Sequence, residues 1–296
     1  MLSYSETPIS EIKGDFLSKA QIKLYVKRED LNHPLVSGNK WWKLKYNLEE
    51  ANRTGQQKLL TFGGAYSNHV YATAAAAAAC GMESIGVIRG ERNLPLNSTL
   101  AFAMSQGMHL HYLSREAYRK KSELQFVESL RQKFGDFYLI PEGGTNEWAI
   151  KGCVEWAKKL QEIKFDVVCL PVGTGGTIAG LIAGLQGKNV IGFSALKEGD
   201  FLKDVIRTLA FEFTGKEFSN WSIDTKYHFG GYAKSNNVLQ SFIRSFDQDH
   251  GVALDEIYTG KMMFWILDRI KQNKFERETT ILALHTGGLQ GRLNSS

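Results

Sequence analysis

One stretch of this 296-residue chain reads Leu170-Pro171-Val172-Gly173-Thr174-Gly175-Gly176-Thr177-Ile178-Ala179-Gly180. It begins in an apolar run that is typical of a buried strand, and it ends in a helical pattern. A glycine-rich turn at this place offers free backbone N–H groups at the positive end of a helix dipole, so it can hold an anion. The hydroxyls of Thr174 and Thr177 add donors that suit a phosphate. A tight turn without a ligand is the alternative interpretation.

The spacing of these glycines excludes two common nucleotide-binding loops. No Gly-Lys-Ser/Thr follows the turn as in a Walker A loop, and Ile178 stands where a dinucleotide-binding fingerprint has its third glycine. The loop therefore indicates a site for a single phosphate group.

Short β-branched runs alternate with longer helical patterns on both sides of this unit. The predicted strands are 58–62, 84–89, 108–113, 137–140, 166–170 and 280–284, and the predicted helices are 70–80, 96–106, 116–134 and 147–163. Such alternation indicates parallel sheets that are covered by helices on both faces. Because ligands bind at the carboxyl ends of such strands, the diglycines Gly63-Gly64, Gly143-Gly144 and Gly287-Gly288 are further candidate positions.

The composition limits the classes of protein to consider. The chain is long enough for about two domains, and its 43% hydrophobic and 23% charged residues indicate a globular protein. Its net charge of +5 is spread along the chain, so we expect neither a nucleic acid partner nor a membrane partner. Neither the apolar runs nor the histidine spacing predicts a membrane span or a metal site. Three distant cysteines in apolar segments predict reduced, buried thiols in a cytoplasmic protein.

A reactive amine is predicted in Ser37-Gly38-Asn39-Lys40, where a polar turn leads from a strand-like run into a helical pattern. An amine near a helix N-terminus feels the positive end of the dipole, and partial burial also disfavours its charged form. Both effects should lower the pKa of Lys40, and a neutral amine can form a Schiff base with an aldehyde. An ordinary surface lysine beside a helix cap is the alternative.

A further strand-to-helix turn reads Gly63-Gly64-Ala65-Tyr66-Ser67-Asn68-His69. Ser67 and Asn68 could cap the following helix or bind a carboxylate. His69 alone is equally compatible with a structural histidine. A Ser/His hydrolase is disfavoured, because no GxSxG elbow surrounds Ser67.

Together these motifs resemble a pyridoxal-phosphate family, the 1-aminocyclopropane-1-carboxylate deaminase and D-cysteine desulfhydrase group. The motifs follow the family's order over nearly the whole chain: Ser37-Gly38-Asn39-Lys40, 64–69, Gly143-Gly144-Thr145-Asn146, 173–177 and Tyr258-Thr259-Gly260-Lys261. The resemblance implies fold type II, the tryptophan-synthase-β-like α/β fold, with two open twisted parallel-sheet domains. A larger domain would combine 1–43 with 143–296, and 44–142 would form a smaller inserted domain. It also implies bound pyridoxal 5'-phosphate, a small amino-acid substrate and a homodimer.

The resemblance assigns the cofactor to particular residues. Lys40 matches the lysine that carries the cofactor, and Lys43 matches a second lysine near it. Gly173, Thr174, Gly175, Gly176 and Thr177 match the phosphate loop, in agreement with the anion site derived above. Asn68 matches the asparagine beside the phenolic oxygen of the cofactor.

Three further residues match positions at the reacting part of the substrate. Ser67 matches a serine that holds the substrate carboxylate or assists at the reacting carbons. Tyr258 and Tyr232 match aromatic hydroxyls over the site. With Lys40, these residues are the predicted catalytic groups.

Two threonines bear on the reaction. The deaminase branch looks like Tyr-Glu-Gly-Lys and His-Leu-Gly-Gly where this chain has Thr259 and Thr286. A carboxylate at the pyridine nitrogen makes the ring a strong electron sink, whereas a hydroxyl leaves it milder and suited to a good β leaving group. The pair therefore resembles the desulfhydrase branch, which eliminates sulfide from D-cysteine and leaves pyruvate and ammonia.

Three alternatives remain open at this stage. They are a ring-opening deaminase on the same scaffold, a non-catalytic small-ligand binding protein, and a nucleotide-binding α/β protein that uses the 173–177 loop. One departure from the family concerns Trp41-Trp42, which precede Lys43 where the family usually has an arginine after Lys40. These tryptophans could pack in the core or shape the pocket.

Overall fold

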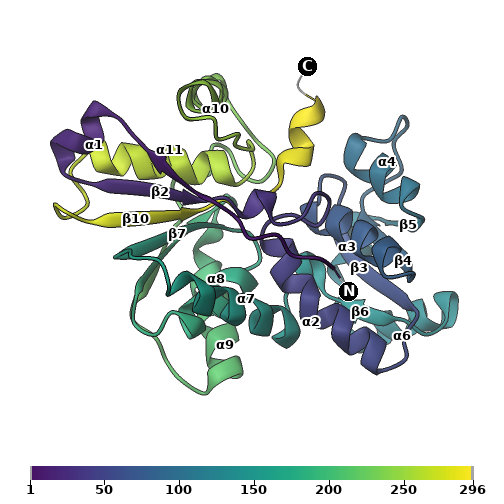
Figure 1. Ribbon diagram of the computed structural model, residues 1–296. Helices are drawn as coiled ribbons and strands as arrows, with labels where there is room; N and C mark the ends of the chain where they lie inside the picture. The colour runs from purple at the N-terminus through teal and green to yellow at the C-terminus, as the bar shows by residue number, and fades with distance from the viewer. Residues whose placement is uncertain (1, 295–296) are drawn as a thin grey trace.

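The computed structural model describes residues 2–294, which form two β-sheets flanked by helices (Figure 1). The larger sheet has the strand order β1-β2-β10-β7-β8-β9, and the smaller sheet has the order β5-β4-β3-β6. All neighbouring strands are parallel except β1, which lies antiparallel to β2 at one edge of the larger sheet. The predicted α/β class with two parallel sheets is confirmed.

The strands have the following bounds. The larger sheet contains β1 (Ile9–Ile12), β2 (Lys23–Lys27), β7 (Val167–Val172), β8 (Asn189–Ser194), β9 (Trp221–Asp224) and β10 (Thr280–Leu284). The smaller sheet contains β3 (Lys58–Gly64), β4 (Glu83–Arg89), β5 (Met108–Leu113) and β6 (Tyr138–Ile140).

The helices join and cover these strands. They are α1 (Asp15–Ala20), α2 (Asn39–Arg53), α3 (Asn68–Ala79), α4 (Ser98–Ser105), α5 (Arg115–Arg119), α6 (Leu124–Phe134), α7 (Glu147–Leu160), α8 (Gly176–Gly184), α9 (Leu202–Thr214), α10 (Asn237–His250) and α11 (Thr259–Lys271). Short 3₁₀ turns are η1 (Glu29–Leu31), η2 (Glu142–Gly144), η3 (Gly199–Phe201) and η4 (Leu289–Asn294). Among residues 2–294, no helix combines the length and the apolar character that crossing a membrane requires.

The larger sheet has an apolar layer on each face, because its central strands are buried on both sides. On one face, Leu24 of β2 packs with the helices α10 and α11, and on the other, Leu170 of β7 packs with α7 and α8 (Figure 1). Strand β10 lies between β2 and β7, and Leu284 is in register with Lys27. The carboxyl ends of β2, β7 and β10 therefore meet at one edge of the sheet.

Helix α2 connects the two sheets. Trp41 and Trp42, near its start, are buried in the core of the larger sheet, where Trp42 stacks on Trp156. Further along the helix, Leu44 and Leu48 belong to the core beneath the smaller sheet. The tryptophans therefore pack in the core and do not line the pocket described below.

One predicted helix was wrong in its extent. Residues 116–134 form two helices, α5 and α6, separated by the residues 120–123. Tyr118 and Leu130 are both buried against the smaller sheet. On one continuous helix these residues would lie about 120° apart around the axis, and the break lets each helix turn its own residue toward the sheet.

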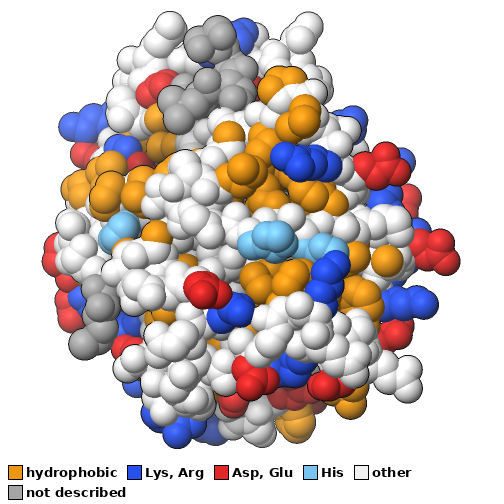
Figure 2. All heavy atoms as spheres, turned by 90° about the vertical axis from the view of Figure 1, so that its right-hand side faces the viewer, with side chains coloured by type: hydrophobic (Ala, Val, Ile, Leu, Met, Phe, Trp, Pro, Cys, Tyr) orange, Lys and Arg blue, Asp and Glu red, His pale blue; other side chains and the backbone are white. Residues whose placement is uncertain are grey.

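The three cysteines are free thiols, as predicted. Cys153 and Cys169 are buried, but Cys80 at the end of α3 is only partly buried, so the expectation of burial was wrong for that residue. On the one face that Figure 2 draws, charge is spread as the sequence indicated. Figure 2 shows the side of the molecule on which α4 and β5 lie, where basic and acidic side chains are interspersed around hydrophobic and histidine side chains.

Candidate functional site

A pocket of about 560 Å³ lies where the carboxyl ends of strands from both sheets meet. Its wall combines residues that end or follow β3, β4, β7, β8 and β10. Most of the predicted site residues line it: Lys40, Lys43, Ser67, Asn68, Gly173, Thr174, Gly175, Thr177, Tyr232, Tyr258 and Thr286. Gly176 and Thr259 are the predicted residues that the structure places outside this lining.

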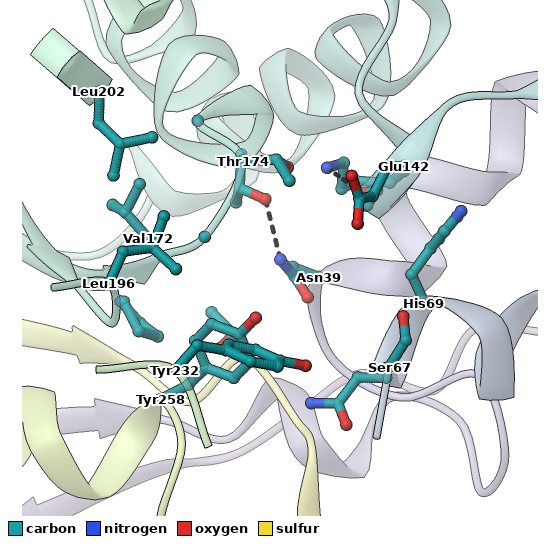
Figure 3. Close-up of a pocket in the computed structure, with 18 of the residues that line it drawn as sticks. Asn39, Ser67, His69, Glu142, Val172, Thr174, Leu196, Leu202, Tyr232 and Tyr258 are labelled. Carbon is teal, nitrogen blue, oxygen red and sulfur yellow. Dashed lines mark hydrogen bonds between the residues drawn. The ribbon is translucent and has the colours of Figure 1, made fainter. Parts of the chain in front are cut away.

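Lys40 lies in the first turn of α2, and its position is set by the turn before it. Gly38 has a φ of 70°, and a Cβ there would lie 2.0 Å from the carbonyl oxygen of Thr286, so only glycine fits. The Lys40 Nζ donates to Asn39 Oδ1 at 2.9 Å. Asn39 Nδ2 in turn donates to Thr177 Oγ1 at 2.9 Å, the bond that Figure 3 marks beside Asn39. This chain of bonds joins the amine to the glycine-rich loop.

The pKa of Lys40 is lowered to about 7, first by burial and second by the positive charge of Lys43. A substantial fraction of the amine is therefore neutral at neutral pH, which a nucleophilic lysine requires. Lys43 is itself buried, and its Nζ donates to Gly143 O and to Thr145 Oγ1. Burial lowers its pKa to about 8, so Lys43 keeps more of its charge than Lys40 does at the same pH.

The 173–177 loop leads from β7 into α8. The first N–H groups of a helix have no partner within it, and at α8 these groups belong to the loop. A Cβ at Gly173 would lie 3.1 Å from the Tyr258 hydroxyl, and Gly175 has a φ of 83°. The absence of side chains at these positions keeps the backbone N–H groups accessible from the pocket, as an anion site requires. Gly176 lies behind the lining, where a Cβ would approach Lys43 Nζ to 3.2 Å.

Ser67 and Asn68 begin helix α3. Ser67 Oγ accepts a hydrogen bond from Val70 N at 3.3 Å, so the serine is an N-cap and its own hydroxyl hydrogen remains available to the pocket. Asn68 Oδ1 accepts from Gln290 Nε2 at 2.6 Å, and a Cβ at Gly288 would lie 2.6 Å from Asn68 Nδ2. The amide is therefore held in place by the turn that follows β10.

His69 lines the pocket although sequence reasoning treated it as an unassigned histidine. Its Nε2 lies 2.8 Å from Thr61 Oγ1, whose own hydrogen is donated to Ile140 O. Nε2 must then carry the imidazole proton, which leaves Nδ1 as an acceptor. Within the described residues this buried Nδ1 has no hydrogen-bond partner, and burial lowers the pKa of His69 well below its usual value. His69 is thus a neutral imidazole with one free lone pair.

Two tyrosines form another side of the pocket. The ring centroids of Tyr232 and Tyr258 are 6.1 Å apart (Figure 3). Burial is the main cause that raises the pKa of each, and the neighbouring Tyr232 and Asp255 raise the pKa of Tyr258 further. The Tyr232 hydroxyl donates to Tyr66 O at 3.4 Å. Both hydroxyls therefore stay protonated and can donate hydrogen bonds.

The two threonines that bear on the reaction differ in position. Thr286, after β10, is among the lining residues. Thr259 is fully buried, and its hydroxyl donates to Asp255 Oδ2 at 2.5 Å. Asp255 also accepts from the backbone N–H groups of Tyr258 and Thr259, so its carboxylate caps the start of α11. The Thr259 hydroxyl is used in that cap and not in the pocket.

Sequence reasoning missed two groups of lining residues. Arg89, Lys121 and Glu142 contribute charge from the side of the smaller sheet. Arg89 ends a parallel strand, and the strand-end rule could have found it. Leu196 and Leu202 contribute an apolar wall, which Figure 3 shows on the side away from Ser67 and His69. No sequence signal distinguishes such residues from ordinary core residues.

Metal coordination has no candidate in the described part of the chain, because no group of three or more His, Cys, Asp or Glu residues gathers there.

Comparison with known proteins gives a consistent result. A family model described as "Pyridoxal-phosphate dependent enzyme" matches residues 1–287. A bifunctional D-cysteine desulfhydrase/1-aminocyclopropane-1-carboxylate deaminase of Arabidopsis thaliana is 30% identical, over 91% of this chain and 73% of the plant protein. A D-cysteine desulfhydrase of Serratia proteamaculans is 27% identical, over 96% of this chain and 92% of the other. The crystal structure of an ACC deaminase homologue superimposes with a TM-score of 0.84 at 28% identity, over 98% of this chain and 92% of the other.

Proposed function

Because this chain belongs to the family of pyridoxal-phosphate-dependent enzymes, we propose that it eliminates the β-substituent of a small, D-cysteine-like amino acid and releases pyruvate, ammonia and sulfide. The observation that carries the choice of reaction is the hydroxyl of Thr286 in the pocket lining. Within the described residues, Glu142 is the one carboxylate of that lining, and Tyr118 and Lys121 already bind it. This lining favours the mild electron sink that a good leaving group needs.

The residues of the pocket fit pyridoxal phosphate. The cofactor has an aldehyde, a phosphate and a pyridine ring, and the pocket offers a matching group for each. Lys40 supplies an amine with a lowered pKa, and the 173–177 loop supplies free N–H groups at a helix N-terminus. Asn68 and Thr286 supply polar groups for the ring, and Lys43 would keep a positive charge near the cofactor.

When bound, pyridoxal phosphate withdraws electrons from the α-carbon of an amino acid that is attached to it. The protein's part is to orient the substrate and to move protons. Lys40, once released from the cofactor, would accept and return a proton with its neutral amine. Ser67 would donate its free hydroxyl hydrogen to the substrate carboxylate.

The tyrosines and the histidine complete this assignment. Tyr258 and Tyr232, which remain protonated, would hold or protonate the departing group. His69 would accept a hydrogen bond at Nδ1, because the imidazole stays neutral and this nitrogen has a free lone pair. Leu196 and Leu202 would exclude water from the opposite wall.

Replacing Lys40 tests the cofactor assignment. We expect Lys40→Ala to abolish the visible absorption band of the purified protein and the release of pyruvate. Lys45→Ala is the matched control, because Lys45 lies on the same helix outside the pocket and pairs with Glu155. Wild-type protein that binds no pyridoxal phosphate would refute the assignment.

A substrate panel tests the reaction. We expect sulfide and pyruvate from D-cysteine. The second candidate is ring opening of 1-aminocyclopropane-1-carboxylate, which the bifunctional name of the plant relative favours. Formation of 2-oxobutyrate from that substrate, with no pyruvate from D-cysteine, would replace the first proposal by the second. Protein that binds the cofactor but converts neither substrate would support a ligand-binding role.

We further propose a cytoplasmic homodimer with two domains, 1–43 plus 143–296 and the inserted 44–142. The free thiols support a reducing compartment. The division into domains is supported by the smaller sheet, whose strands all fall within residues 58–140. Light scattering coupled to size-exclusion chromatography tests the dimer, and a monomer at micromolar concentration would contradict it.

A further inference from the structure

A second cavity, of about 370 Å³, shares a wall with the main pocket. Four basic side chains and one tyrosine line it: Arg89, Arg115, Tyr118, Arg119 and Lys121. Arg89 and Lys121 also line the main pocket, so the two cavities have these two cations in common. No carboxylate belongs to this lining in the described part of the chain.

The cations of this basic cavity are poorly neutralised by the protein. Lys121 Nζ lies 3.3 Å from Glu142 Oε2, and the Tyr118 hydroxyl donates to Glu142 Oε1 at 2.9 Å. Both oxygens of Glu142 are therefore engaged. Arg89, Arg115 and Arg119 form no ion pair with any described residue, and Arg89 contacts the Tyr118 ring instead, 5.8 Å from its centroid.

The fold brings these cations together at a cost in electrostatic repulsion. Arg89 ends β4 in register with Leu113 of β5, and α5 starts two residues later, at Arg115. Arg115 and Arg119 are four residues apart on this helix, a spacing at which like charges repel and weaken a helix. Tyr118 anchors the helix to the core. Arg119, in the last turn, is favoured by the helix dipole, but Arg115, in the first turn, is not. An anion bound between the two arginines would turn their repulsion into attraction.

We propose that the basic cavity is an anion subsite beside the main pocket, and that it takes a carboxylate, sulfate or phosphate group. Guanidinium groups suit such ligands, because their planar N–H donors match paired oxygens. The anion is either a second acidic group on the amino-acid substrate or a separate inorganic anion. The substrate source rests on the proposed function, whereas the subsite itself does not.

Sulfate binding to the holoenzyme tests the subsite without any turnover. Equilibrium dialysis with radiolabelled sulfate at low ionic strength measures the affinity, and the bound cofactor keeps sulfate out of the 173–177 loop. We expect Arg115→Gln/Arg119→Gln to weaken binding about tenfold or more, because charge-assisted bonds are lost. These arginines lie outside the main pocket, so the variant should keep its absorption band.

A matched variant shows whether sulfate affinity depends on the subsite or only on the net charge of the protein. Lys158→Gln/Arg244→Gln also removes two exposed positive charges, but far from the cavity lining. We expect it to bind sulfate like the wild type. Equal sulfate affinity of both double variants, or no sulfate binding by the wild type, would overturn the proposal.

Kinetics distinguish the two sources of the anion. If the substrate carries it, Arg115→Gln/Arg119→Gln should raise KM for an amino acid with an acidic side chain about tenfold and leave KM for D-cysteine unchanged. If a separate anion binds, sulfate should change the D-cysteine kinetics of the wild type but not those of the variant. A protein that binds sulfate as predicted but turns over no amino acid would keep the subsite and refute the proposed function.

Discussion

At the residue scale, the pocket depends on two neighbouring lysines with different tasks. Lys40 and Lys43 both have lowered pKa values, but only Lys43 donates to two fixed acceptors, Gly143 O and Thr145 Oγ1. The charge that Lys43 retains is the second cause of the low pKa of Lys40. Lys43 therefore acts on the chemistry of Lys40 through space, by disfavouring a second positive charge.

This coupling predicts how pH affects cofactor uptake. Only the neutral amine attacks an aldehyde, and the Lys40 pKa of about 7 lies below its ordinary value. The rate at which apoprotein takes up pyridoxal phosphate should therefore rise with pH, with a midpoint at about 7, and level off at higher pH. Removing the Lys43 charge in Lys43→Met should raise the pKa of Lys40 and move this midpoint to higher pH. Stopped-flow absorbance between pH 6 and 10 measures both curves.

The control for this prediction is Lys45→Met, which removes a charge from the same helix outside the pocket. Its midpoint should equal that of the wild type. A wild-type rate that keeps rising to pH 10 would show that the Lys40 amine titrates like a free lysine, and the coupling would then be wrong.

The sequence predicted the lining residues whose neighbours in the chain form a distinctive motif. The prediction failed where a contact between distant groups decides whether a side chain reaches the pocket. The glycine-rich loop and the turn before Lys40 have backbone requirements that leave a local signature. Thr259 and Thr286 look equivalent in sequence, yet only Thr286 reaches the pocket. The difference arises from Asp255, whose carboxylate takes the Thr259 hydroxyl into a helix cap. Such a competition between acceptors has no signature in residue spacing.

At the element scale, the turn that carries Tyr232 is held by one buried cation. Phe229 and Ala233 have positive φ angles of 48° and 53°, which are unfavourable for residues other than glycine. Lys261, in the first turn of α11, donates from Nζ to His228 O and Gly231 O, each at 2.8 Å. These bonds fix two carbonyl groups of the turn, one of them directly before Tyr232, to a helix of the larger sheet, and they make Lys261 a positioning residue for Tyr232.

Replacing Lys261 should affect the substrate and leave the cofactor in place. Lys261→Met keeps the length of the side chain but leaves two carbonyl groups without their charged donor. We expect kcat/KM to fall about tenfold or more, with an unchanged cofactor absorption band and faster proteolysis of the 228–233 turn. Steady-state kinetics and limited proteolysis at neutral pH measure these effects.

Lys261→Arg should restore part of the activity, because it keeps a charged donor at the same place. A loss of activity in Lys261→Met that comes with loss of the absorption band would indicate general unfolding and contradict the positioning role. Unchanged kinetics in Lys261→Met would show that the turn holds Tyr232 without the cation.

An element was predicted correctly where its apolar residues follow a single pattern and pack in a single core. Strand β5 was predicted with its observed ends, since its neighbours are turns with strong signals. The helix predicted over 116–134 was wrong in its extent, because the polar residues 120–123 interrupt it, and this break lets Tyr118 and Leu130 both pack on the smaller sheet. The residues of that break and of α5 also form the basic cavity, so the site was missed together with the element.

At the scale of the whole molecule, the two sheets differ in how the chain builds them. All four strands of the smaller sheet lie between residues 58 and 140, so its contacts are local. The larger sheet places β10, near the end of the chain, beside β2, near its start. Helix α2 contributes to both cores, with Trp42 in one and Leu44 in the other. The chain therefore passes from one core to the other within a helix, and not through a linker.

This asymmetry predicts which fragments fold. The fragment 44–142 contains the four strands of the smaller sheet and the residues Leu44, Leu48 and Ala51 that cover one face, so we expect it to unfold cooperatively on its own. A chain truncated after residue 279 lacks β10, which separates β2 from β7, so its larger sheet should not form. Because the smaller sheet has no strand beyond residue 140, it should survive in that truncated chain. Hydrogen exchange should therefore show slow amides in β3 and β4 but none in β7 and β8. A random-coil spectrum for the fragment 44–142 would contradict this order, and it would mean that the smaller sheet folds only against α7 and the larger core.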